Sequence, residues 1–207
     1  MSDTAKLSIQ GKETELPLVI GTENEVGVDI SRLRSSTGAV TLDFGYKNTG
    51  STTSKITYLD GEQGILRHRG YAIEELAEKA DFLEVAYLLI NGELPTKSEY
   101  QAWDEDIRHH TLVNEDMENI FKAWPTGSHP MGQLIAMISS LSSFYPESLN
   151  PNSNEEERMR TIKRLLAKMP TICAMIHKKR VGHPVIYPQN NLNYVENYLN
   201  MTFKHVT

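Results

Sequence analysis

The sequence has little of several features that would assign a protein to a class at once. It contains one cysteine, Cys173, which excludes an internal disulfide. It has no long basic run and a formal net charge of −6, and this disfavours nucleic acid as a partner. Its longest apolar stretches, such as residues 85–90 and 132–138, fall far short of the roughly 20 residues that span a bilayer. We therefore expect neither a nucleic acid partner nor a membrane span.

Signals for export, common catalytic motifs and metal-ligand patterns are also missing. The N-terminal residues MSDTAKLSIQ lack the basic and then apolar layout of a secretory signal, which favours the cytoplasm as the compartment. There is no phosphate-binding loop, no dinucleotide-binding glycine pattern, no serine nucleophile elbow and no zinc-protease motif. None of the seven histidines pairs with another histidine or with the cysteine at the spacing of a structural zinc site, so we expect no bound metal.

The residue patterns that are present divide the chain into two parts. Residues 1–54 form a β-rich N-terminal segment, and residues 55–70 follow as a β-hairpin whose turn, with Asp60, Gly61 and Gly64, needs a positive φ. From Tyr71 the hydrophobic period becomes helical. The fold class predicted is therefore mainly α, preceded by a small β-rich segment. The predicted strands of that segment are Lys6–Ile9, Glu15–Ile20 and Ala39–Phe44.

Capping residues and prolines mark where the helices begin and end. The first helices are predicted over 73–80 and 82–90, and from the cap Thr96 to about His109. A helix that begins at Pro130 is apolar or small on every side and should be buried almost all round. Ser153 and Glu156 are predicted to cap the next helix. Pro170 should break or kink it before a second apolar segment, Ile172–Ile176.

A basic triplet, residues 178–180, ends the last of these segments. In a final helical turn its positive charges complement the negative end of the helix dipole. Binding of a phosphate group is the alternative interpretation. The sequence favours the role at the helix end.

Five stretches then resemble the citrate synthase family in order and spacing. The most specific is residues 55–71, KITYLDGEQGILRHRGY, which is similar to the family's hairpin. The others are YLLINGELPT (87–96), SHPM (128–131), LLAKMPT (165–171) and YPQNNLNYVENYLNM (187–201). The chain is on these grounds identified as a member of the family, with residues 55–207 as the first part of its large helical domain. The β-rich start resembles the longer, NADH-regulated form from Gram-negative bacteria.

The resemblance implies an enzyme that condenses acetyl-CoA with oxaloacetate to citrate and CoA, an acyl transfer in the tricarboxylic acid cycle. It implies no required cofactor and assembly into homodimers or hexamers. The family's catalytic histidines lie in motifs such as HADHEQN, GPAHGG and GHRVYK, none of which occurs in these 207 residues. We therefore expect the catalytic residues downstream of residue 207. By itself this chain should be an inactive, truncated piece that lacks the small domain. A 2-methylcitrate synthase and a non-catalytic helical regulatory or assembly module are the alternatives.

The resemblance also implies part of an allosteric NADH site. Its residues by motif are His110, Thr111, Leu112, Tyr145, Arg164, Lys168 and Asn190. Arg164 and Lys168 lie four residues apart, on one helical face, where they could meet a pyrophosphate. Two positions depart from the regulated pattern, His109 in place of an arginine and His183 in place of a glutamine. The alternative interpretation is a solvated helix face, with Tyr145 as a cap or interface residue.

Overall fold

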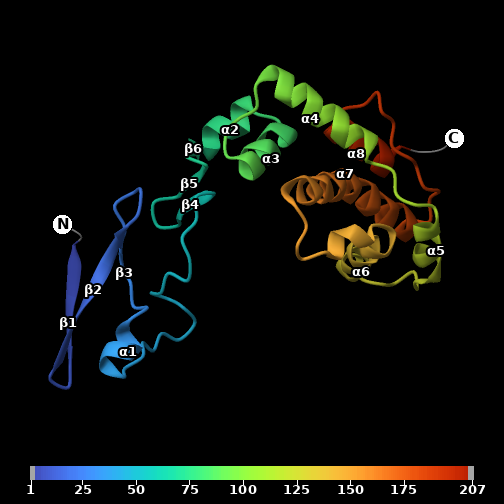
Figure 1. Ribbon diagram of the computed structural model, residues 1–207. Helices are drawn as coiled ribbons and strands as arrows, with labels where there is room; N and C mark the ends of the chain where they lie inside the picture. The colour runs from blue at the N-terminus through green and yellow to red at the C-terminus, as the bar shows by residue number, and fades with distance from the viewer. Residues whose placement is uncertain (1–2, 205–207) are drawn as a thin grey trace. The chain divides into compact units, whose positions relative to one another are not determined.

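The computed structural model describes residues 3–204, which divide into two compact units between Lys55 and Ile56 (Figure 1). The first unit holds an antiparallel sheet of order β1-β2-β3 and one short helix. Its elements are β1 (Thr4–Ile9), β2 (Lys12–Ile20), β3 (Val26–Val28) and α1 (Leu33–Thr37). Leu16 of β2 and Leu33 of α1 are its buried apolar side chains. The two predicted strands at 6–9 and 15–20 are therefore confirmed.

The strand predicted at Ala39–Phe44 is wrong, because residues 39–43 have no regular secondary structure and a turn begins at Phe44. The Asp43 carboxylate accepts hydrogen bonds from the backbone N–H groups of Lys47 at 3.1 Å and Asn48 at 3.0 Å. These bonds lower the pKa of Asp43, as does the bond from the Thr49 hydroxyl, which is the largest cause. The carboxylate thus folds the chain back on itself where the apolar alternation alone indicates an extended strand.

The second unit begins with a three-stranded antiparallel sheet of order β4-β5-β6. The strands are β4 (Thr57–Asp60), β5 (Ile65–His68) and β6 (Tyr71–Ala72). Thr57 pairs with His68 and Asp60 with Ile65, so the predicted hairpin is confirmed. The Asp60 carboxylate accepts N–H bonds from Glu62 and Gln63, and Gly64 takes the predicted positive φ of 70°.

Helices make up the rest of this unit, and those predicted over 73–80, 82–90 and from Thr96 to about His109 begin and end within one residue of the prediction. Side-chain capping boxes start α3 at Asp81, α4 at Thr96 and α8 at Asn193. Gly92, with φ of 100°, ends α3 as expected. The helices are α2 (Ile73–Lys79), α3 (Phe82–Asn91), α4 (Lys97–His109), α5 (Asp116–Ala123), α6 (Pro130–Phe144), the 3₁₀ turn η1 (Pro146–Leu149), α7 (Glu155–Arg180) and α8 (Tyr194–Phe203).

The long helix α7 lies at the centre of this unit and packs against α4, α6 and α8 (Figure 1). One apolar cluster joins α7 to α5 and α6 around Met137 and Ile172, and a second joins it to α3 and α4 around Leu83 and Ile107. Both clusters fix α7 along its length. Within residues 3–204, no helix is long and apolar enough to cross a membrane.

Three predictions about these helices need correction. The cap of α7 is Asn154 with Glu157 rather than Ser153 with Glu156, because both pairs fit the same pattern and Asn154 has the extended backbone of a cap. Helix α6 is not buried all round: Met131 is 54% exposed and Ile135 is 67% exposed, since α5 and α7 cover only the opposite face.

Of the break or kink predicted at Pro170, the break is wrong, because α7 runs unbroken from Glu155 to Arg180. Proline has no N–H to donate to the Leu166 carbonyl, which lies four residues earlier. The Tyr194 hydroxyl of α8 donates to that carbonyl oxygen instead, at 3.0 Å. A side chain from another helix thus supplies the missing bond.

The basic triplet lies at the end of α7, and two of its lysines bind backbone carbonyls of other segments. Lys178 is buried and donates to the Lys204 carbonyl at 2.6 Å. Lys179 donates to the Trp124 carbonyl at 3.0 Å. These contacts support the structural interpretation of the triplet over phosphate binding, although their acceptors are tertiary ones rather than the end of α7 itself.

Candidate functional site

The sequence-predicted residues Tyr145, Arg164 and Lys168 come together where α6 ends against α7. The Arg164 guanidinium carbon lies 4.4 Å from the centre of the Tyr145 ring, and the Lys168 ammonium lies 5.4 Å from it. Both cations therefore lie over the face of one aromatic ring, and the negative potential of that face attracts them. With Glu147, described below, these residues are the α7 cluster.

Lys168 is almost fully buried, with 3% of its surface exposed, and it binds the segment that follows α4. Its ammonium donates to the His110 carbonyl at 2.8 Å and also to the Leu112 carbonyl. The Thr171 hydroxyl, on the next turn of α7, donates to the Thr111 carbonyl at 2.8 Å. Three consecutive carbonyls are thus held by α7, and the sequence-predicted residues 110–112 belong to the same site.

Burial is the main cause that lowers the pKa of Lys168 to about 8, and the positive charge of Arg164 lowers it further. The desolvated ammonium is compensated by the two carbonyl acceptors. Lys168 is therefore first a structural lysine that holds the 110–112 segment. A ligand phosphate would meet it at short range only if that segment moved.

Arg164 is the more accessible cation, and a glutamate already pairs with it. Its guanidinium donates to the carboxylate of Glu147, and 20% of the Arg164 side chain and 45% of the Glu147 side chain are exposed. This bond is the largest cause that holds the pKa of Glu147 below its ordinary value. Glu147 lies in η1, two residues after Tyr145. Sequence reasoning missed it because the ion pair joins residues whose separation has no helical periodicity.

A small cavity of about 30 Å³ lies beside the α7 cluster. It has room for only one or two water molecules. Its lining residues are Leu141, Tyr145, Ser148, Thr161, Arg164, Leu165 and Lys168. A nucleotide cannot enter it, so any nucleotide that uses these residues must lie on the surface above them.

A larger hollow of about 250 Å³ lies between α4 and α7, and it contains His110. Asp106 pairs there with the Lys163 ammonium and lies 3.2 Å from Nδ1 of His110. The spacing of Asp106 and His110 could be read from the sequence, whereas the pair with Lys163 could not. This hollow extends the candidate site along the groove between the two helices.

The remaining sequence-predicted residue, Asn190, is not brought into the α7 cluster. It lies in an exposed turn before α8, and no hydrogen bond among residues 3–204 joins it to Arg164 or Lys168. His109, the first departure from the regulated pattern, is exposed, and its Nδ1 lies 2.7 Å from the Glu105 carbonyl. His183, the second, is exposed in the turn that follows α7.

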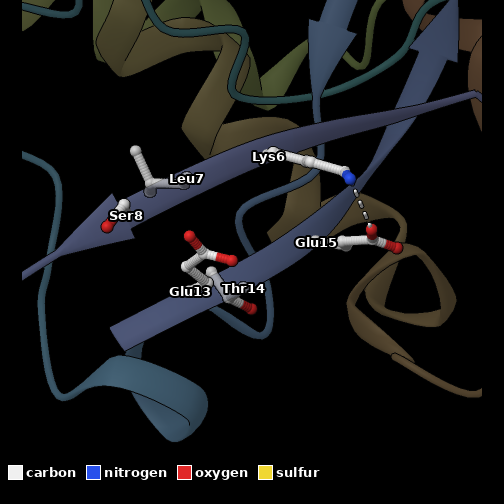
Figure 2. Close-up of a pocket in the computed structure, with 6 residues that line it drawn as sticks. All are labelled: Lys6, Leu7, Ser8, Glu13, Thr14 and Glu15. Atoms are coloured by element: carbon white, nitrogen blue, oxygen red, sulfur yellow. Dashed lines mark ion pairs between the residues drawn. The ribbon is translucent and has the colours of Figure 1, made fainter. Parts of the chain in front are cut away.

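The first unit of the chain also carries a surface hollow. A hollow of about 190 Å³ lies on the β1–β2 hairpin (Figure 2), where Lys6 and Glu15 are 3.7 Å apart and both largely exposed. No buried charge or nucleophile lines it, so it offers no chemistry. Within residues 3–204, no three histidine, cysteine, aspartate or glutamate side chains gather in a way that could hold a metal ion.

Comparison with known proteins gives a consistent result. The family model described as "Citrate synthase, C-terminal domain" matches residues 45–207. The chain is 46% identical over 206 residues to the citrate synthase of Corynebacterium glutamicum. The aligned region covers 100% of this chain and 47% of that protein. This chain therefore spans about half the length of that relative.

Two solved structures extend the likeness to the fold. The crystal structure of citrate synthase from Pyrobaculum aerophilum has a TM-score of 0.67 at 31% identity, over 73% of this chain and 40% of that one. The crystal structure from Thermotoga maritima MSB8 has a TM-score of 0.67 at 30% identity, over 79% of this chain and 42% of that one.

Proposed function

Because the chain belongs to the citrate synthase family, we propose that the full-length protein condenses acetyl-CoA with oxaloacetate to give citrate and free CoA. The observation that carries the proposal is the family match over residues 45–207. The family's three histidine motifs do not occur in this sequence. We therefore place the catalytic groups downstream of residue 207, and we assign residues 55–207 to the first part of the large helical domain.

The test is a CoA-release assay on two samples of verified intact mass, the full-length protein and the 207-residue chain. Acetyl-CoA and propionyl-CoA are compared, each with oxaloacetate. We expect release from acetyl-CoA by the full-length protein and none by the 207-residue chain. A preference for propionyl-CoA would instead make the protein a 2-methylcitrate synthase. No release from either thioester would favour a non-catalytic regulatory or assembly module, and release by the 207-residue chain would contradict our placement of the catalytic groups.

We propose in addition that the α7 cluster is part of a regulatory nucleotide site, with NADH as an inhibitor and no cofactor required for the reaction. Arg164 and Lys168 supply positive charge beside an aromatic ring, and the 110–112 segment and the neighbouring groove extend the surface. Such a combination suits a ligand that joins phosphate groups to planar rings. Asn190 is the least supported member of the proposed set.

The regulatory proposal is tested by NADH fluorescence titration of the full-length protein. Arg164→Ala should weaken binding about tenfold or more, because it removes a charge-assisted contact to phosphate. Arg158→Ala is the matched control, since Arg158 is an exposed arginine of α7 whose guanidinium bonds to the Ser153 carbonyl instead. Equal effects of the two substitutions would refute a specific site at Arg164.

We also propose that the full-length protein is a homodimer or hexamer that works in the cytoplasm. The exposed apolar side chains of α6, Met131 and Ile135, support an interface on that helix, because stable homo-oligomer interfaces are rich in apolar surface. Native mass spectrometry of the full-length protein and of Ile135→Asp decides between assembly through α6 and assembly elsewhere. An unchanged mass for the variant would contradict the α6 interface.

A further inference from the structure

The arrangement of η1 puts an acidic side chain where a ligand phosphate would have to bind. Tyr145 ends α6, and its carbonyl accepts the Ser148 N–H at 3.0 Å, which closes a tight turn around Glu147. The same short segment therefore carries the ring that faces Arg164 and the carboxylate that pairs with it. The two contacts take up different parts of one guanidinium.

A guanidinium offers its N–H groups only along its edge, in its own plane. The Tyr145 ring lies 4.4 Å from the guanidinium carbon and covers one face of the group. Glu147 binds Nη1 along the edge. The other nearby cation, Lys168, already donates to two carbonyls and is buried. Arg164 is thus the accessible charge of the α7 cluster, and Glu147 holds it.

We propose that Glu147 is an internal competitor, whose carboxylate occupies Nη1 of Arg164 in the ligand-free protein and must be displaced before a phosphate group can bind that nitrogen. The inference rests on the proposed nucleotide site and names what sets its affinity and selectivity. A diphosphate carries more negative charge than one carboxylate and can displace it, whereas a ligand with a single carboxylate cannot. The displacement needs only a side-chain rotation, because 45% of the Glu147 side chain is exposed.

The experiment compares NADH binding by the full-length wild-type protein and by Glu147→Gln. Glutamine keeps the shape of the side chain and removes its charge. We expect NADH to bind the variant about threefold more tightly, within the range from roughly 1.4-fold to fivefold that an exposed ion pair supports. The affinity for adenosine, which has no phosphate, should not change.

Glu75→Gln is the matched control. Glu75 is 52% exposed and pairs with Lys79 at 2.9 Å, but it lies on α2, which packs against β5 and β6. The control alters the net charge by the same amount and should leave NADH binding unchanged. Equal effects of the two substitutions would mean that the general field of the protein sets the affinity. That result would overturn the inference, and so would an unchanged or weaker affinity of Glu147→Gln.

Failure of the proposed NADH site is distinguished by a second probe, inorganic pyrophosphate, followed by thermal shift. If NADH binds neither protein but pyrophosphate binds Glu147→Gln more tightly than the wild type, the NADH proposal is wrong and the competitor is supported. If pyrophosphate also binds neither protein, both proposals are wrong. If NADH binds only the variant, the internal competitor is established in its strongest form.

Discussion

Replacing Tyr194 with phenylalanine tests why α7 continues through Pro170. The proline leaves the Leu166 carbonyl without its helical partner, and the Tyr194 hydroxyl donates to that oxygen at 3.0 Å. The bond is partly buried, and burial is also the main cause that raises the pKa of Tyr194 to about 12. Loss of the hydroxyl therefore leaves a carbonyl that has no helical N–H to bind and that is partly shielded from water.

The magnitude follows from what the substitution leaves in place. Phenylalanine keeps the ring, which stacks on Phe82 with centroids 4.9 Å apart, so that only the hydrogen bond is removed. The free energy of unfolding should fall by about 1–2 kcal/mol, the cost of one unsatisfied buried acceptor. Urea denaturation followed by circular dichroism measures it. Tyr198→Phe on the same helix is the control: Tyr198 is 36% exposed, and its change should stay within about 0.5 kcal/mol.

A double-mutant cycle with Pro170→Ala decides whether the proline is the reason. Alanine restores an N–H that can bond to the Leu166 carbonyl, so the hydroxyl is no longer its only donor. In the Pro170→Ala background, Tyr194→Phe should cost less than about 0.5 kcal/mol. An equal cost in both backgrounds would refute the reasoning, because the hydroxyl would then stabilise the protein in some other way.

Three further predictions use the same denaturation assay. Lys168→Met should change the pH dependence: the pKa of Lys168 falls from 10.5 to about 8 on folding, so the unfolded chain binds the proton more tightly between these values. As the pH rises through this window, the free energy of unfolding of the wild type should therefore increase relative to that of the variant, by up to about 1.4 kcal/mol per pH unit. Parallel plots of the two unfolding free energies against pH would contradict this. Asn154→Ala should lower the free energy of unfolding by about 1 kcal/mol, and Ser153→Ala should leave it almost unchanged. The reverse order would show that Ser153 is the cap of α7. Gln133→Met should raise stability by about 1 kcal/mol, because Gln133 is 3% exposed and its amide has no partner within residues 3–204; a loss would show that a buried water binds it.

The parts of the fold that were predictable depend on local chemistry. The capping boxes at Asp81 and Thr96 and the Asp60 turn each act within a few residues, so the sequence shows both partners. The wrong predictions concern structure that depends on distant or competing contacts. The partner of the Leu166 carbonyl comes from Tyr194, which no local pattern connects to Pro170. The turn at Asp43 competes with an apolar alternation that is itself typical of a strand.

The candidate site was predictable to the same degree. The spacing of Arg164 and Lys168 on one helical face can be read from the sequence, and the structure places both beside Tyr145. What they bind cannot be read from it. Lys168 donates to carbonyls 56 and 58 residues earlier, and Arg164 pairs with Glu147 across a turn between two helices. These contacts set which of the two cations a ligand can reach.

The 110–112 segment is bound by residues of α7 on both sides of Pro170. Lys168 lies before Pro170 and Thr171 lies after it, and together they bind the carbonyls of three consecutive residues. The segment therefore bonds to α7 both before and after the proline. Tyr194 of α8 donates to the Leu166 carbonyl, which the proline cannot bind. A helix broken at Pro170 could not hold all three carbonyls at once. Because residues 110–112 belong to the proposed nucleotide site, a ligand that moves them must break the bonds from Lys168 and Thr171, which lie on either side of the proline.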